Sequence, residues 1–175
     1  MFFGCLIRDI SVHLEYLKAS IEATEAEIQN FTNQTPGLKA KQELLVSIPG
    51  VGKKTSARLL AEIGEINRFE NAPQLAAYAG LNPKGFSSGS SVHKKTRISK
   101  QGRNELRACL YMPAIVAMTH NPVVRALKER LRKKQLPTMA IVAACMRKLL
   151  HIVYGVLKSQ MPFDPDYDRQ FNFSS

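Results

Sequence analysis

Apolar side chains recur at spacings of three and four residues between residues 8 and 31, and this seam limits the folds open to the chain. Acidic and basic side chains lie between the apolar ones, a pattern typical of a coiled-coil helix. So narrow a seam needs a partner helix, from a second copy or from elsewhere in a longer chain. The alternative is an amphipathic helix that packs on its own domain. The seam consists of Ile10, Leu14, Leu17, Ile21, Thr24, Ile28 and Phe31, of which only Thr24 is polar.

The rest of the chain also favours helices, so the predicted fold class is all-α, mainly helical. A short hairpin around residues 84–98 is the one β pattern that we consider, within an otherwise irregular Gly/Ser loop. Ser99 is the expected N-cap of one helix, and Pro113 is expected to kink it. Asn121-Pro122 and Pro137 mark the starts of the next two helices. The helices are expected at residues 40–64 (helix, turn and helix), 71–79, 99–119, 122–134 and 138–159.

These elements suggest three regions. Residues 1–37 form the coiled-coil helix and a linker, because Pro36 and Gly37 interrupt the periodic pattern. Residues 38–160 form the main domain. Residues 161–175 form an irregular tail. Within the main domain, a helix-hairpin-helix-like motif occupies 42–64, a serine loop 80–98 and basic helices 99–160.

Positive charge is concentrated in one part of the chain. Residues 71–160 carry 16 Lys and Arg but only two acidic residues, Glu105 and Glu129, whereas the whole chain has a net charge of +11. A one-sided basic domain is the electrostatic pattern of a nucleic-acid-binding protein. The alternative is a basic surface that is merely solvated.

The segment Ile48-Pro-Gly-Val-Gly52 resembles the turn of a helix-hairpin-helix motif. Its glycines, Gly50 and Gly52, would let backbone amides approach a phosphate, and the following helix N-terminus would add its dipole. Lys53 and Lys54 would supply formal charge. The alternative is a packing hairpin that touches no nucleic acid.

A serine-rich loop is followed at once by cations. A serine hydroxyl can attack a phosphodiester and hold the phosphorus covalently, provided that cations stabilise the developing charge. Ser87, Ser88, Ser90 and Ser91 are candidates, and His93 is the histidine nearest to them. The expected nucleic-acid-binding cations here are Lys94, Lys95, Arg97, Lys100 and Arg103.

Other kinds of site are not predicted. Walker, Rossmann and metal-spaced His/Cys patterns are absent, and residues 71–163 offer too few carboxylates for a two-metal nuclease. We therefore expect no metal and no cofactor in this chain. The cysteines Cys5, Cys109 and Cys145 are far apart, which favours a reducing cytoplasm. No apolar run of about 18 residues predicts a membrane span.

Several stretches, taken in order, resemble one family. They are Leu45-Val-Ser-Ile-Pro-Gly-Val-Gly52, Leu75-Ala-Ala-Tyr-Ala-Gly-Leu-Asn-Pro83, Ser88-Gly89, Arg97-Ile-Ser-Lys-Gln-Gly102, Leu106-Arg107 and His120-Asn-Pro122. Each is weak alone, but the ordered set is similar to the C-terminal domain of the IS116/IS110/IS902-type insertion-sequence transposases. The resemblance covers about residues 8–160.

The resemblance implies a composite enzyme. In that family a RuvC-like domain with four acidic residues and Mg²⁺ meets a nucleophilic serine of the helical domain, and a bridge RNA selects DNA. The serine maps onto Ser88, with Ser87 as runner-up. Because the sequence begins just before the coiled coil, we expect the acidic domain to be absent and strand transfer by this chain alone to be weak or lacking. The expected partners are DNA, bridge RNA and a second copy of the chain, in a prokaryotic cytoplasm at the nucleoid.

Two other functions remain open from the sequence. The chain could be a non-catalytic nucleic-acid-binding and dimerisation module, a remnant of a transposase. It could also be a helix-hairpin-helix DNA-repair domain, which would explain residues 44–64 but not the serine loop. Replacement of Ser88 distinguishes the serine-bearing transposase from the binding module, since only in the transposase does covalent chemistry need the Ser88 hydroxyl.

Overall fold

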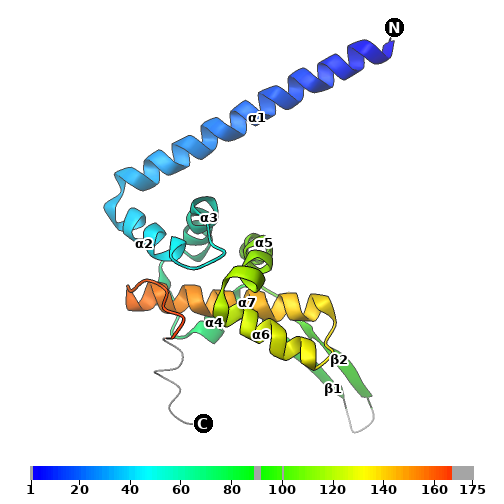
Figure 1. Cartoon of the computed structure of the whole chain (residues 1–175), viewed down its shortest axis with the longest axis vertical. Coiled ribbons are helices and arrows are strands. Elements are labelled where there is room, and N and C mark those ends of the chain that lie inside the picture. The colour runs from blue at the N-terminus through cyan, green and yellow to red at the C-terminus, as the bar shows by residue number, and fades with distance from the viewer. Residues whose placement is uncertain (1, 89–91, 100, 167–175) are drawn as a thin grey trace. The chain divides into compact units, whose positions relative to one another are not determined.

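The computed structural model describes residues 2–88, 92–99 and 101–166, with side chains for 7–83, 98–99 and 101–166. Its described residues are mainly helical, as predicted, with one two-stranded antiparallel sheet. Figure 1 shows the elements. They are α1 (Phe2–Gln34), α2 (Pro36–Val46), α3 (Lys53–Ile63), the 3₁₀ helix η1 (Ile66–Arg68), α4 (Ala72–Tyr78), β1 (Pro83–Ser88), β2 (Val92–Ile98), α5 (Asn104–His120), α6 (Pro122–Lys133) and α7 (Thr138–Ser159).

The chain divides into two compact units, residues 1–39 and residues 40–175. In the first, the predicted N-terminal helix is confirmed as the single long helix α1, and it ends just before Pro36. Large apolar side chains of its seam are exposed, among them Ile10, Leu14, Leu17 and Ile21. Their exposure leaves the seam free for a partner, and whether it forms a coiled coil stays a prediction.

Helix α7 is the central element of the second unit and packs against α4, α5 and α6. By length and composition alone it could cross a membrane, and half of its most apolar stretch is buried inside the protein. The buried apolar side chains of α7 belong to the protein core, because they lie on the faces of the helix that neighbouring helices cover. Those side chains are Ile141, Val142, Cys145, Met146, Leu149, Leu150, Val153, Val156 and Leu157.

Asn121 connects α5 to α6. Its backbone N–H donates to the carbonyl of Ala117 at the end of α5, and its side-chain oxygen accepts from the N–H groups of Val123 and Val124 at the start of α6. The predicted start at Asn121-Pro122 is confirmed, since the capping oxygen and the proline at the first helical position act together.

The expected N-cap at Ser99 is wrong. Helix α5 begins at Asn104, and Arg103 occupies the N-cap position without a side-chain cap. The Ser99 N–H instead donates to the carbonyl of Asn82 at 2.8 Å, so this residue extends the pairing of the sheet. Gly102 then turns the chain with a φ of +151°, which a helix cannot accommodate.

Two buried thiols make the stability of the fold sensitive to alkaline pH. Burial raises the pKa of Cys109 and of Cys145 to about 11, so the folded state favours the protonated thiol. The unfolded chain binds fewer protons above about pH 9, and the free energy of unfolding should therefore fall as pH rises from about 9 to 11. Urea unfolding at about pH 8 and pH 10.5 measures this fall. A Cys109→Ala, Cys145→Ala control should show a smaller fall, and equal falls would contradict the assignment.

Candidate nucleic-acid interface and serine hairpin

The serines lie at the end of the first strand of a β-hairpin. Strands β1 and β2 pair antiparallel, with Ser87 opposite His93 and Ser88 opposite Val92. The segment is thus a hairpin rather than an irregular loop, which β-branched residues along β2 favour. Its register shifts between Lys84 and Phe86, where Gly85 allows a bulge. The candidates Ser90 and Ser91 lie outside the described residues.

The hairpin joins the helical body through a neck, by which we mean residues 78–82 on the entering side and Ser99 with 101–103 on the returning side. Between its described residues, backbone hydrogen bonds run from Ser99 N–H to the Asn82 carbonyl at 2.8 Å and from Arg103 N–H to the Tyr78 carbonyl at 2.7 Å. The neck therefore continues the hairpin's pairing down to the start of α5.

Arg103 lies in a network of side chains at the neck. Its Nε donates to Glu62 Oε2 at 2.9 Å, and its Nη1 donates to the hydroxyl of Tyr78 at 3.3 Å. The neighbouring carboxylate raises the pKa of Arg103, and hydrogen bonding to Arg68 is the main cause of a lowered pKa at Tyr78. Arg103, predicted to bind nucleic acid, is thus engaged with α3 and α4.

The two glycines of the predicted helix-hairpin-helix turn have different surroundings. Gly50 lies against α5, where an added Cβ would be 2.9 Å from the Ala117 nitrogen and 3.0 Å from the Pro113 carbonyl oxygen. Gly52 faces open space and occupies the N-cap position of α3, with Lys53 and Lys54 exposed in the first turn. Close packing against α5 gives Gly50 a structural role, and the phosphate-binding role of Gly50, Gly52, Lys53 and Lys54 stays a prediction.

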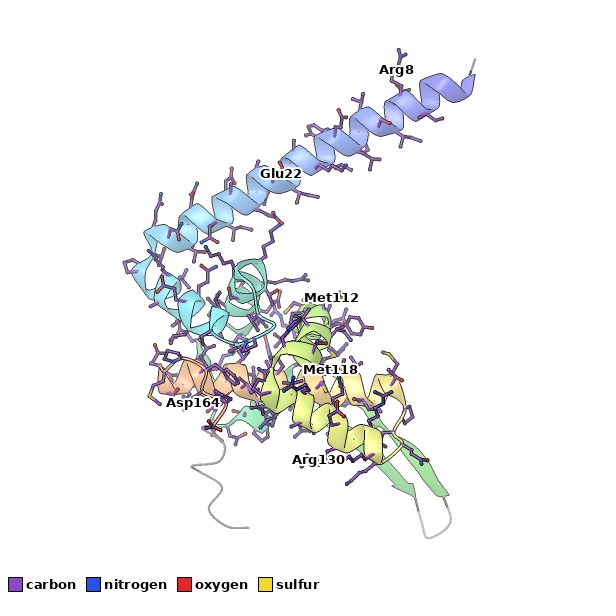
Figure 2. All side chains as sticks on the ribbon, in the orientation of Figure 1. Arg8, Glu22, Met112, Met118, Arg130 and Asp164 are labelled. Atoms are coloured by element: carbon purple, nitrogen blue, oxygen red, sulfur yellow. The ribbon has the colours of Figure 1, made fainter. Side chains whose placement is uncertain are left out.

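Of the remaining predicted cations, three lie on β2 and one lies outside the described residues. Lys94, Lys95 and Arg97 lie on β2, where only the backbone is described, and Lys100 lies outside the described residues. Helix α6 also ends in cations, for which the sequence predicts no particular site. Arg130 on this helix is marked in Figure 2. The exposed cations of α6 and the residue after it are Arg125, Arg130, Arg132, Lys133 and Lys134.

Carboxylates and histidines do not form a metal site in the described part of the chain, where no group of three or more His, Cys, Asp or Glu residues could hold an ion. Catalytic metals in phosphoryl transfer are held by several convergent carboxylates. The described residues therefore do not fit a Mg²⁺ ion.

The sequence does not predict that Glu62, Arg68 and Tyr78 take part in contacts at the neck. Glu62 is 41 residues from Arg103 and Tyr78 is 25 residues from it, so no local spacing links them. The sequence holds one weak signal that Glu62 pairs with a later cation. Glu62 is an acidic residue on α3, and the charged residues between 71 and 160 are almost all basic.

Comparison with known proteins shows what class of protein this arrangement belongs to. Residues 42–129 match the model of the transposase IS116/IS110/IS902 family, half of the chain. The chain belongs to that family, as the ordered motifs predicted.

Individual relatives extend the match. A pilin gene-inverting protein of Moraxella bovis is 40% identical over 87% of this chain and 48% of its own length. The insertion element IS110 43.6 kDa protein of Streptomyces coelicolor is 29% identical over 78% and 32%, respectively. A probable family 20 transposase of Pseudomonas aeruginosa is 26% identical over 93% and 47%. The chain thus spans about half the length, or less, of these curated relatives.

Proposed function

We propose that this chain is the serine-bearing part of a DNA transposase or recombinase, which binds DNA and supplies the nucleophile for strand cleavage and exchange. The observation that supports it best is the position of Ser87 and Ser88 at the end of β1, in a hairpin whose return strand carries Lys94, Lys95 and Arg97. Membership of the transposase family and the names of the relatives agree with this function.

The proposed step is a phosphodiester exchange. The Ser88 oxygen attacks the phosphorus of a DNA strand, its proton passes to a base, and the bond from phosphorus to the leaving deoxyribose oxygen breaks. The leaving oxygen takes up a proton. Because a phosphoserine diester replaces a DNA diester, a second DNA hydroxyl can reverse the step on another strand without an external energy source. Cations near the hairpin would stabilise the additional negative charge on the phosphoryl oxygens.

Other parts of the proposed enzyme come from outside these residues. We propose that a RuvC-like acidic domain, in a longer protein or a separate chain, completes the active site, and that a structured bridge RNA selects the DNA. The test is to combine this chain with donor DNA, RNA and the acidic domain and to look for a covalent protein–DNA product. A product that forms equally well without this chain would contradict the proposal.

We propose that the α1 seam pairs with the seam of a second copy. The supporting observation is the exposure of its large apolar side chains within their own unit. Sedimentation of the chain with Leu14 and Leu17 replaced by Asp should show a lower mass than wild type. Equal masses would mean that the seam does not mediate association.

The second candidate function is a binding module without chemistry. It is favoured by the exposed cations on and just after α6, which lie outside the serine hairpin and could bind a phosphate backbone by themselves. Under this alternative, DNA affinity and its salt dependence persist when both serines are replaced, and no covalent product ever forms.

A salt titration locates the interface. Neutralising Lys94, Lys95 and Arg97 together should reduce the slope of log affinity against log salt by roughly 2–3, because each phosphate contact releases about one counterion. Fluorescence anisotropy with labelled duplex DNA measures the slope. Neutralising Arg130, Arg132 and Lys133 is the matched control with the same change in charge. A slope that falls only in the control variant would place the main interface on α6.

A further inference from the structure

We propose that Arg103, Glu62 and Tyr78 are positioning residues that fix the orientation of the serine hairpin relative to the helices beneath it. The consequence for catalysis depends on the proposed function, whereas the conformational role does not. Arg103 was expected from the sequence to bind nucleic acid. The contacts of its guanidinium group instead assign it to the neck.

The backbone of the neck supplies the first argument. The chain enters the hairpin directly from the end of α4, where Gly80 N–H and Leu81 N–H donate to the carbonyls of Ala77 and Ala76, each at 2.9 Å. It leaves the hairpin directly into α5. The two sides are held together at Tyr78 and Asn82 by the cross-neck hydrogen bonds described above. The angle of the hairpin is therefore set where α4 and α5 approach each other.

Gly102 shows how closely the two sides approach. A Cβ at this position would lie 2.6 Å from the Gly80 nitrogen and closer still to the Tyr78 carbonyl oxygen. These are backbone atoms and cannot rotate away as a side chain can. Glycine thus permits a contact between the two sides that any other residue would open. The close contact makes the neck a defined joint rather than a loose connection.

The side chain of Arg103 connects the neck to two helices. The Glu62 carboxylate comes from α3 and its side chain is only 17% exposed, while the Tyr78 hydroxyl comes from α4. Arg103 itself is half exposed. A guanidinium group holds two partners at fixed angles because its donors are coplanar, which an ammonium group cannot reproduce. Arg103 therefore fixes the returning side against both helices.

The partners are themselves held in place. The Arg68 guanidinium lies 4.6 Å from the centre of the Tyr78 ring and 4.7 Å from that of Phe69, and Phe69 is buried. Cation–π contacts of this geometry restrain the Tyr78 ring. One turn further along α5, Arg107 donates to the Ala79 carbonyl at 3.0 Å and to Asn104 at 2.8 Å. The neck is thus supported from α3, η1, α4 and α5.

A fixed hairpin matters for the proposed chemistry. A nucleophile must lie within about 3–3.5 Å of the reacting atom, and a misplacement of about 1 Å can lower the rate a hundredfold. In the described structure, β1 and β2 contact chiefly each other, and few other elements touch them. The serine's position therefore depends on the neck.

Distance measurements between two spin labels test the conformational role without any activity. Labels are placed at Val92→Cys on β2 and at Ser159→Cys at the exposed end of α7, in a Cys5→Ser background. Cys109 and Cys145 are buried and should remain unlabelled. We expect one narrow distance distribution in this background. Arg103→Gln and Glu62→Gln should each widen it at least twofold, and Arg103→Lys should give an intermediate width.

The control is Arg132→Gln, which removes the same charge from an exposed position on α6 and should leave the width unchanged. A general loss of stability would lower the melting temperature but would not widen the distribution of the folded molecules. Unchanged widths in both Arg103→Gln and Glu62→Gln would overturn the proposal. If Arg103→Gln fails to fold, the isosteric Glu62→Gln decides.

Binding and cleavage separate this role from a phosphate contact. Arg103→Gln should leave the salt dependence of DNA binding unchanged, whereas loss of a phosphate contact would reduce the slope by about 0.9. With the acidic domain, RNA and DNA supplied, formation of the covalent product should fall at least tenfold. A reduced slope with an unchanged distance distribution would return Arg103 to the nucleic-acid interface. Absence of product from the wild type would contradict the proposed function, and the distances would still decide the role of the neck.

Discussion

Replacing Ser88 by Ala should abolish the covalent protein–DNA product while DNA binding persists. The hydroxyl oxygen is the atom that forms the bond to phosphorus, so no other change of comparable size removes the chemistry so completely. Loss of a nucleophile lowers enzymatic rates by roughly a thousandfold or more. The product is measured on denaturing gels after incubation with labelled donor DNA, bridge RNA and the acidic domain.

Ser87→Ala is the matched control, because it removes the same atom one residue away. It should retain most of the product. Ser87 is paired with His93 across the two strands, whereas Ser88 is paired with Val92. The control therefore also tests the runner-up nucleophile. If Ser87→Ala loses the product and Ser88→Ala keeps it, the assignment from the family motif is wrong by one residue. If both keep it, neither Ser87 nor Ser88 is the nucleophile.

Replacing Gly50 by Ala should lower the free energy of unfolding by roughly 2–5 kcal/mol. The φ of Gly50 is +104°, which side chains rarely adopt, and the added Cβ would press on backbone atoms of α5. Left-handed backbone costs about 1–2 kcal/mol, and overpacking in a close contact costs about 1–3 kcal/mol. Urea unfolding followed by circular dichroism measures the change.

Gly52→Ala is the matched control, since an added Cβ there meets nothing within 4 Å. It should change stability by less than about 1 kcal/mol. This pair separates two roles that the sequence left open for the Pro-Gly-Val-Gly turn. If Gly50→Ala were as stable as wild type but bound DNA less tightly, Gly50 would serve the nucleic acid rather than the packing of α5.

Local signals in the sequence predicted much of the helical fold. The Asn-Pro pair at 121–122 and the proline at 137 mark the starts of α6 and α7 as expected, because capping and a fixed φ act within a few residues. The start of α5 was missed. Ser99 has the residue type of an N-cap, but its N–H is used by Asn82 across the neck, a contact that depends on tertiary structure.

The candidate site was predicted less completely. The serines and the cations after them are adjacent in the sequence, so their proximity needed no fold. Arg103 belongs to that basic run in the sequence, and its ion pair with Glu62 is a contact that local spacing does not predict. Gly50 matched a motif, yet its close neighbours come from α5, more than 60 residues later in the chain. Pairings over such separations are decided by packing, which periodicity and spacing do not encode.

The central claim is that a serine of this hairpin becomes covalently attached to DNA. The most direct test is to digest the protein–DNA product and identify the modified residue by mass spectrometry. Our account predicts a nucleotide attached through phosphate to Ser88, in the peptide that spans β1 and β2. Attachment to a residue outside the hairpin, or to the acidic domain, would contradict it.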